Sequence, residues 1–403
     1  MRCEFGALAR DAQLKVMSFV ALSVVLCSFG CREQQAEQSS RTPSKAPIVE
    51  EKRPIPGGKT IAPSGGPPFP YTIEPWCAAF SPDGKQILVG FGHHMFVAHD
   101  RQKPPGWSVQ LFDVESGKHL QTLNGHRGDV RFVAFFPDGK TAISSGGGGC
   151  LIWDLKKGAE VSRFLLHFDY GALLPDGRRL LCSSNRKLEL WDVLQGTRLN
   201  KYDEIDNMVR SITVSPDGKH ALLGCVPEMI NGKGDLTLFR LWDVERGRLL
   251  RNFDRGNHHL DAPCAFSEDS KLAVMVRWNR DPTNENAVLW ELDSRRETKE
   301  FPAFAFEPIA AHLSLKENRI VVAGSRGELL CLDVESGKEL WTTKGPALGF
   351  FAFWANGKLG LSAGGTQRTQ MNLILWDTES GRELRQLQPN FQERPRPPVV
   401  NHP

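Results

Sequence analysis

Histidine and cysteine are the residue types in this chain best suited to metal or redox chemistry. Two histidine pairs occur, His93-His94 and His258-His259, and paired imidazoles can bind Zn²⁺. Nine cysteines are present, but none shows the Cys-x-x-Cys spacing of a metal or redox site. The two histidine pairs belong to widely separated parts of the chain, so we expect that they cannot share one ion. We therefore predict no metal site.

Motifs for catalysis are absent from the sequence. It contains no nucleophile elbow and no His-Glu-x-x-His motif. A glycine run spans residues 146–149, but it joins two predicted strands, whereas a phosphate-binding loop precedes a helix. We interpret the run as a tight loop, and we predict no catalytic residue, no cofactor and no enzymatic activity.

The composition of the chain argues against a nucleic-acid partner. The chain has 403 residues, 40% of them hydrophobic and 24% charged, which is typical of a globular protein. The formal net charge is only +3 and no block of lysine or arginine stands out, so we expect no nucleic-acid binding.

A turn of the type Ser-Pro-Asp-Gly recurs along the chain. Proline presets the first central position, aspartate can bond its own backbone, and glycine accepts the left-handed conformation that closes the turn. Clear copies lie at 81–84, 136–139, 174–177 and 215–218, and weaker copies at 267–270, 315–318 and 354–357. Each copy separates two short apolar runs, which predicts a hairpin of two strands.

A second landmark, an aromatic residue followed by an acid, ends a third predicted strand in each unit. Trp-Asp occurs at 153–154, 191–192, 242–243 and 376–377, with relaxed copies at 112–113, 290–291 and 332–333. In all but one unit, glycine follows four residues after the acid, before a fourth strand. The chain therefore contains seven units of four strands.

These motifs resemble the WD-repeat family over nearly all of Tyr71 to Gln388. The resemblance implies an all-β fold, a seven-bladed β-propeller of four-stranded antiparallel blades spanning residues 71–388. The family's Gly-His pair occurs once, at Gly125-His126, so its buried hydrogen-bond network should be absent or partial in most blades. We predict that residues 382–388 supply an unswapped outer strand to the last blade. The alternative is that the segment around Thr60-Ile61 pairs at that edge.

Loop lengths predict where recognition takes place. The two acids of a unit are 30 residues apart in the first unit, 26 in the fourth, 22 in the fifth and 21 in the seventh, against 16 in the other three. The extra residues lie between strands two and three, and in a propeller those loops share one face with the blade-to-blade connections. We predict that this face binds a protein or peptide, although ordinary solvated loops remain the alternative. The candidate contact residues are His93, His94, His99, Arg101, Trp107, Met229, His258, His259, Trp278, Arg280 and Arg368.

The N-terminal residues resemble an export signal. Residues 16–29 form an apolar run after basic residues, and 14 residues are too few to cross a hydrocarbon core of about 30 Å as a helix. Ser28 and Gly30 precede Cys31, which resembles a bacterial lipoprotein signal (1–30) with Cys31 lipidated. Plain cleavage to a soluble exported protein and an uncleaved anchor are the alternatives. We expect localisation to the cell envelope or periplasm, with membrane contact only through the lipid.

Three further expectations concern the remaining segments. Residues 31–70 and 389–403 are predicted to be a solvated tether and a proline-rich tail without a core-forming pattern. The six cysteines at positions 77, 150, 182, 225, 264 and 331 are expected to be small buried side chains, with disulfides as the alternative in an exported protein. We expect a monomer.

One segment resembles a different propeller family. Residues 327–341 read Gly-Glu-Leu-Leu-Cys-Leu-Asp-Val-Glu-Ser-Gly-Lys-Glu-Leu-Trp. This is similar to the repeat of pyrroloquinoline-quinone dehydrogenases and of their non-enzymatic relatives in outer-membrane assembly. A quinoprotein-like propeller is therefore the alternative to an interaction module of the WD type.

Overall fold

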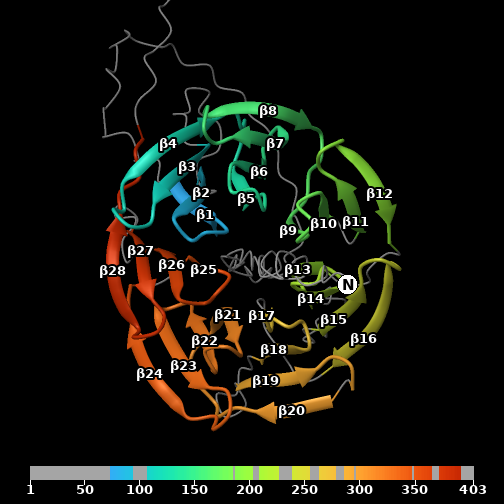
Figure 1. Cartoon of the computed structure of the whole chain (residues 1–403), viewed down its shortest axis with the longest axis vertical. Helices are drawn as coiled ribbons and strands as arrows, with labels where there is room; N and C mark the ends of the chain where they lie inside the picture. Colours follow the sequence, from blue (N-terminus) through green and yellow to red (C-terminus); the bar gives the residue numbers. More distant parts are fainter. Residues whose placement is uncertain are drawn as a thin grey trace, which may run out of the picture.

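A computed structural model describes residues 73–93, 107–184, 187–202, 208–226, 238–254, 263–277, 286–294, 296–346, 349–364 and 372–391. The described residues form strands, turns and connections, without a helix. The strands are grouped into seven four-stranded antiparallel sheets arranged in a ring (Figure 1). This confirms the predicted seven-bladed β-propeller.

Each blade uses four strands that are consecutive in the chain. The innermost strands, nearest the ring axis, are β1 (Ile73–Phe80), β5 (Val130–Phe135), β9 (Tyr170–Leu173), β13 (Met208–Val214), β17 (Cys264–Phe266), β21 (Pro308–Ser314) and β25 (Phe350–Phe353). The second strands are β2 (Gln86–His93), β6 (Thr141–Gly146), β10 (Arg179–Ser184), β14 (His220–Val226), β18 (Leu272–Arg277), β22 (Arg319–Gly324) and β26 (Leu359–Gly364).

The remaining strands complete the blades toward the rim. The third strands are β3 (Ser108–Asp113), β7 (Gly149–Asp154), β11 (Lys187–Asp192), β15 (Leu238–Asp243), β19 (Asn286–Glu291), β23 (Glu328–Asp333) and β27 (Asn372–Asp377). The outer strands are β4 (His119–Asn124), β8 (Ala159–Phe164), β12 (Thr197–Lys201), β16 (Arg248–Asp254), β20 (Arg296–Glu300), β24 (Glu339–Lys344) and β28 (Arg382–Leu387).

Burial changes from the ring axis to the rim. All of β21 is buried, whereas all of β12 is exposed. Inner strands carry apolar side chains on both faces, because each blade is covered by a neighbour on either side. Seven apolar clusters result, and each one joins residues of two adjacent blades. A single blade would leave both of its faces in water, so the ring is the smallest unit that hides all of them.

Blades 1 and 7 close the ring. β1 contacts β25, and one cluster includes Phe91 of blade 1 and Phe350 of blade 7. β28 pairs with β27 at the outer edge, which confirms the prediction of an unswapped seventh blade. Thr60 and Ile61, the alternative strand, lie outside the described residues, as do the predicted signal, Cys31 and the tether.

The chain after β28 returns to blade 1. The side chain of Gln110, fully buried in β3, donates to the carbonyl of Asn390 (3.0 Å) and accepts from its amide (2.9 Å). The Phe391 ring lies edge-on to that of Phe91, with 5.1 Å between ring centroids. The first residues of the predicted tail therefore pack at the seam between blades 7 and 1.

The recurring acids hold the turns. In the turn at 136–139, Oδ1 of Asp138 accepts from the amides of Lys140 (2.8 Å) and Thr141 (2.9 Å). The acid that ends the third strand acts in the same way, since Oδ1 of Asp154 accepts from the amide of Lys157 at 2.9 Å. Carboxylates thus satisfy turn amides that have no strand partner.

The turn glycines adopt the predicted left-handed conformation. Gly139 has a φ of 63° and Gly357 a φ of 70°. In the two decayed copies that lack glycine, Ser270 (φ 61°) and Asn318 (φ 51°) take this conformation instead. The repeat therefore keeps its backbone geometry where its sequence has drifted.

Side chains on the rim link two pairs of neighbouring blades. The Tyr202 hydroxyl of blade 3 donates to the carbonyl of Val244 in blade 4 at 2.6 Å. The Trp341 indole of blade 6 donates to the carbonyl of Glu379 in blade 7 at 2.9 Å. These contacts add polar connections to the apolar seams.

Candidate functional site

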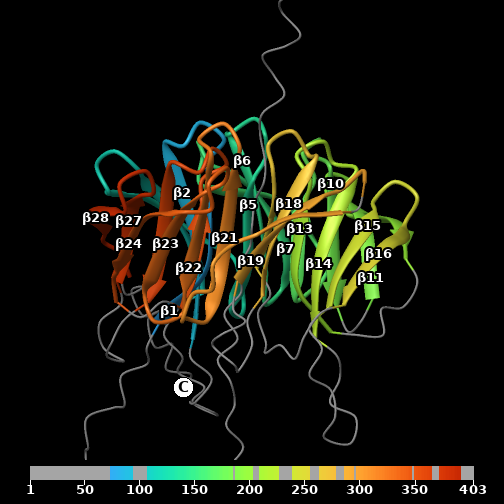
Figure 2. The same ribbon diagram turned by 90° about the horizontal axis from the view of Figure 1, so that it is seen from below.

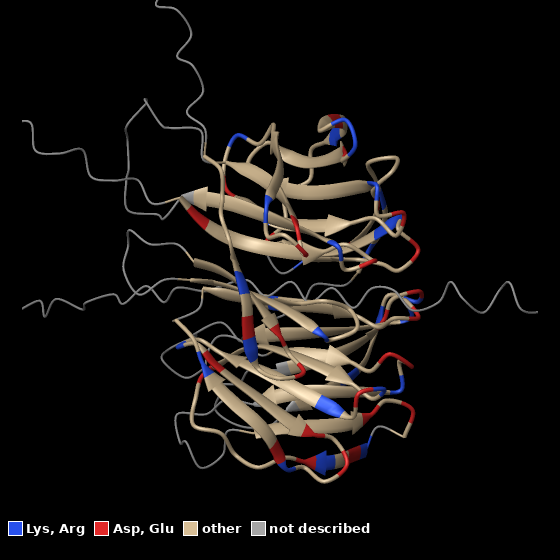
Figure 3. Cartoon of the chain, turned by 60° about the vertical axis from the view of Figure 1, so that its left-hand side comes forward, with Lys and Arg blue, Asp and Glu red and all other residues tan. Residues whose placement is uncertain are grey.

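The ring has two faces of different construction. One, the turn face, carries the turns between first and second strands and those between third and outer strands. The other, the loop face, carries the connections between second and third strands and those between blades. Figure 2 shows the ring edge-on with ordered turns along its upper edge. In Figure 3, the Lys, Arg, Asp and Glu of the described chain are concentrated in these turns, at the right of the view.

The predicted contact residues fall mostly outside the described residues. His93 ends β2 at the loop face, and the half-buried Trp107 immediately precedes β3. Both therefore occupy the predicted face. The other nine candidates lie outside the described residues, and they remain predictions: His94, His99, Arg101, Met229, His258, His259, Trp278, Arg280 and Arg368.

Bulges distort the innermost strands close to the loop face. The strand register shifts at Trp76 in β1, Arg131 in β5, Arg210 in β13 and Ile309 in β21. A bulge leaves one residue unpaired and redirects its side chain. The Arg131 guanidinium lies over the Trp76 ring, 5.1 Å from the ring centroid. Sequence reasoning missed these positions, because a bulge has no signature in the repeat motif.

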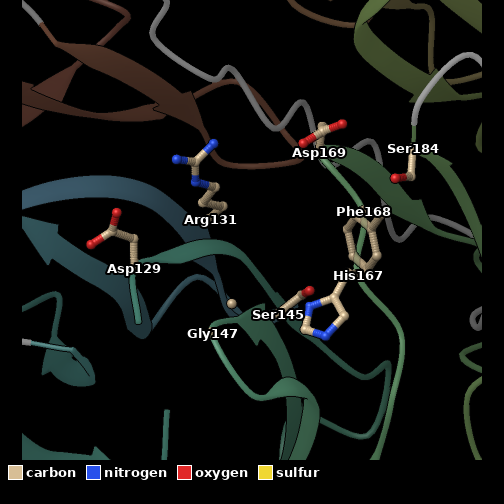
Figure 4. Close-up of a pocket in the computed structure, with 9 residues that line it drawn as sticks. Asp129, Arg131, Ser145, Gly147, His167, Phe168, Asp169 and Ser184 are labelled. Atoms are coloured by element: carbon tan, nitrogen blue, oxygen red, sulfur yellow. The ribbon is translucent and has the colours of Figure 1, made fainter. Parts of the chain in front are cut away.

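A polar hollow on the loop face lies at the seam between blades 2 and 3 (Figure 4). It has a volume of about 310 Å³. Three chain segments meet there: the start of blade 2, the end of β6 with its turn, and the connection into β9 with the end of β10. The lining residues are Asp129, Arg131, Ser145, Gly146, Gly147, His167, Phe168, Asp169 and Ser184. We call this hollow the seam pocket.

A smaller hollow adjoins the seam pocket on the blade 3 side. Its volume is about 200 Å³, and it shares His167 and Ser184 with the seam pocket. Lys187 and Glu189 of β11 add charge to it. Glu189 already accepts from the Trp191 indole and from Arg198, both at 2.9 Å, so its carboxylate is held within blade 3.

The glycine run at 146–149 shapes the seam pocket. β6 and β7 pair across Gly146 and Gly149, which confirms the predicted tight loop. A β-carbon on Gly147 would lie 2.3 Å from the amide nitrogen of Gly128, and one on Gly146 would lie 2.4 Å from the carbonyl oxygen of Asp129. Two backbones approach so closely that only glycine fits. This contact places Asp129 and Arg131 beside the blade 2 loop.

Polar groups in the seam pocket differ from those in the turns. His167 and Asp169 are exposed, and neither side chain makes a hydrogen bond or ion pair within the described residues. Ser145 is buried, with an exposed fraction of 3%, and Ser184 is half-buried. By contrast, the turn carboxylates are occupied by backbone amides. Asp113, for example, accepts hydrogen bonds from the hydroxyl and from the backbone amide of Ser116, and both lower its pKa.

One serine–histidine pair in the structure is structural rather than catalytic. His126 Nε2 and Ser144 Oγ are 2.6 Å apart, and the Trp153 indole donates to the same Oγ at 2.7 Å. Ser144 is fully buried, so no substrate reaches its hydroxyl. Burial lowers the pKa of His126 to about 4, which keeps the imidazole neutral. In blade 7 the Trp376 indole donates to Ser362 at 2.8 Å, which is the partial network that was predicted.

The described chain carries neither a metal-binding cluster nor a disulfide. No group of three His, Cys, Asp or Glu side chains in the described chain is arranged to hold a metal ion. The six cysteines named above are buried thiols, which confirms the expected role and not the disulfide alternative. Among the described residues, none forms a helix of the length and apolarity needed to cross a membrane.

Comparison with known proteins matches two propeller families to different parts of the chain. A WD domain, G-beta repeat model matches residues 117–154, a segment that contains the His126–Ser144–Trp153 network. A model of the outer membrane protein assembly factor BamB matches residues 281–384, in blades 5 to 7. The two matches do not overlap.

A human relative covers a short part of the chain. WD repeat-containing protein 36 of Homo sapiens is 37% identical over 62 residues, which is 15% of this chain and 7% of that protein. The chain thus spans only a small fraction of this relative. Together with the seven observed blades, the WD-repeat match supports a WD-repeat β-propeller.

Proposed function

We propose that the protein is a non-enzymatic interaction module that binds a protein or peptide partner through its loop face. The contrast between the two faces is the observation that carries this proposal. Acids on the turn face are occupied by their own backbone, whereas the loop face has the long insertions, the bulged side chains and the seam pocket. Rigid blades position these groups, so little conformational entropy is lost on binding.

Loop trimming tests the proposal. Residues 94–106 and 227–237 are shortened to glycine-serine linkers, and the tagged protein is used to capture partners from envelope extracts. Captured partners should be lost from the trimmed protein. A matched control replaces the turn at 136–139 with another four-residue turn and should leave capture unchanged. Unchanged capture by the loop-trimmed protein would reject the face assignment.

We further propose that the module acts as a monomer at the bacterial cell envelope. The signal-like residues 1–30 and the match to an outer-membrane assembly factor support this location. Mass spectrometry of the mature N-terminus checks it, because a diacylglyceryl-modified Cys31 is expected. In the Cys31→Ala variant, the lipid mass and membrane association should both disappear.

The match over residues 281–384 favours one second candidate, a quinoprotein-like propeller. Such a protein would bind a quinone, with calcium, near the ring axis. An absorption spectrum of the purified protein, recorded with and without pyrroloquinoline quinone and calcium, separates the candidates. The interaction module predicts the plain sum of the separate spectra, and a perturbed quinone band would favour the second candidate.

A further inference from the structure

We propose that the seam pocket binds the ammonium group of a lysine side chain presented by the partner polypeptide, with Asp169 as its counter-ion. This inference rests on the proposed function, since it assigns a chemical preference to one part of the loop face.

Charge favours a cation. The lining carries two carboxylates, of which Asp129 already interacts with another group of the protein, so Asp169 and the guanidinium of Arg131 are the charges to compare. Arg131 lies over the Trp76 ring of blade 1, so its charge is drawn to that side of the hollow. Asp169 stands on the opposite side, in blade 3, and its carboxylate makes no hydrogen bond or ion pair in the described chain. An incoming ammonium group would supply the missing partner.

The remaining polar groups of the lining can accept hydrogen bonds from an ammonium group. An ammonium group has three donors and no acceptor. Beside Asp169, the hollow offers the hydroxyl oxygens of Ser145 and Ser184 and the exposed imidazole of His167, which lies next to Ser145 in Figure 4. Each of these groups can accept a hydrogen bond. A carboxylate ligand would instead face the carboxylate of Asp169, with Arg131 as its one cationic partner in the lining.

Size and wall chemistry exclude two other ligand classes. A hollow of about 310 Å³ is at the lower end for small-molecule sites, which suits one side chain with water. The one aromatic ring in the lining, Phe168, is buried, so it offers no open platform for a sugar or a cage for a methylated amine. Gly146 and Gly147 leave a wall of bare backbone along which an aliphatic stem can lie.

The pocket's position in the ring supports a peptide as the source of the lysine. Blades 2 and 3 have the shortest second-to-third strand connections, with 16 residues between their acids. In ring order they stand between blades 1 and 4, which have the longest insertions, with 30 and 26 residues. The seam pocket therefore lies, in ring order, between the two blades with the longest insertions, where we expect a polypeptide partner to bind.

Small probes test the inference without any partner. Binding of Nα-acetyl-lysine N-methylamide at millimolar concentration is followed by ligand-observed saturation-transfer NMR. The norleucine analogue lacks the ammonium group, and the glutamate analogue carries the opposite charge. We expect the lysine probe alone to bind. Asp169→Asn should weaken its binding about fivefold, the size of one partly exposed ion pair. Arg131→Gln should strengthen it, and the turn-face control Glu335→Gln should leave it unchanged.

Several results would overturn the inference. Equal binding of the norleucine probe would show an apolar hollow. Binding of the glutamate probe, lost in Arg131→Gln, would show an anion site. Absence of binding by all three probes rejects the pocket as a ligand site. Because no partner is used, these outcomes are independent of the capture experiment. Loss of the seam pocket inference would leave the loop-face proposal in place, and failed capture would leave lysine binding to be judged by the probes.

Discussion

The two faces of the ring use the same residue types for different purposes. On the turn face, aspartates such as Asp138 and Asp154 accept hydrogen bonds from their own turns, and glycines such as Gly139 provide left-handed backbone. On the loop face, Asp169 has no such partner among the described residues, and Gly147 is needed because two backbones meet. An acid or a glycine in this chain therefore acquires its role from its face and not from its type.

The largest expected difference in stability between the two faces concerns two glycines of blade 2, Gly147 on the loop face and Gly139 on the turn face. Gly147→Ala forces a methyl group onto the backbone of Gly128, with no side chain free to move aside. We expect a loss of about 2–4 kcal/mol in the free energy of unfolding. Gly139→Ala meets its nearest atom at 3.8 Å and pays only for its positive φ, a cost of about 1 kcal/mol. Urea denaturation of both variants measures the difference, and equal losses would contradict the account.

Acid should destabilise the ring through its buried histidines. Burial lowers the pKa of His126 and of His312 to about 4, from the usual 6.5. The unfolded chain therefore takes up protons before the folded chain does. The contribution of these histidines to the free energy of unfolding is fully present above pH 6.5. It is lost as pH falls toward 4, by roughly 2–3 kcal/mol for each histidine.

Thermal melts across this pH range measure the effect. The double variant His126→Gln and His312→Gln should be less stable at neutral pH but should lose less stability than the wild type as pH falls from 6.5 to about 5, above the range in which the carboxylates titrate. A wild-type protein with flat stability over this interval would show that these imidazoles are not buried as described.

Ring closure can be loosened from the loop face. A chain ending at Gln388 would leave the buried Gln110 amide without the two hydrogen bonds from Asn390, which costs about 1–3 kcal/mol. Gln110→Leu in the full chain removes the same hydrogen bonds but leaves no unpaired polar group, so it should lose less. Both are compared by urea denaturation. If truncation has no effect, residues 389–391 do not contribute to closure.

The smallest expected difference in stability between the two faces concerns two aspartates, Asp138 on the turn face and Asp169 on the loop face. Asp138→Asn should cost about 1 kcal/mol, because the neutral amide oxygen is a weaker acceptor for the amides of Lys140 and Thr141. Asp169→Asn should change stability by less than about 0.5 kcal/mol, since its carboxylate has no partner within the described residues. The free energies of unfolding of the two variants provide the check. A larger loss for Asp169→Asn would show that its carboxylate is structural.

Local sequence was sufficient to predict the number of blades. The Ser-Pro-Asp-Gly turn and the aromatic–acid pair are short-range features whose geometry depends on a few adjacent residues, and both recur in the structure at the expected places. The single Gly125-His126 pair likewise predicted that the buried network around Ser144 would be complete in few blades. Such features are readable because each one is fixed within its own repeat.

The seam pocket could not be predicted in the same way. Its lining comes from two blades, and Arg131, His167 and Asp169 occupy positions that no motif marks. The long insertions of blades 1 and 4 led to the prediction that the longest loops carry recognition. The seam pocket instead lies between blades 2 and 3, whose connections between second and third strands are short. The packing of Phe391 on Phe91 was missed for a similar reason, because a contact between the two ends of a ring has no local signature.

Site-specific photo-crosslinking in intact cells tests the loop-face claim most directly. A photoreactive residue replaces Arg127 on the loop face or Lys156 on the turn face, two exposed positions in the same blade. The account predicts a crosslinked partner from position 127 and none from position 156. A partner captured from position 156, with none from position 127, would contradict it.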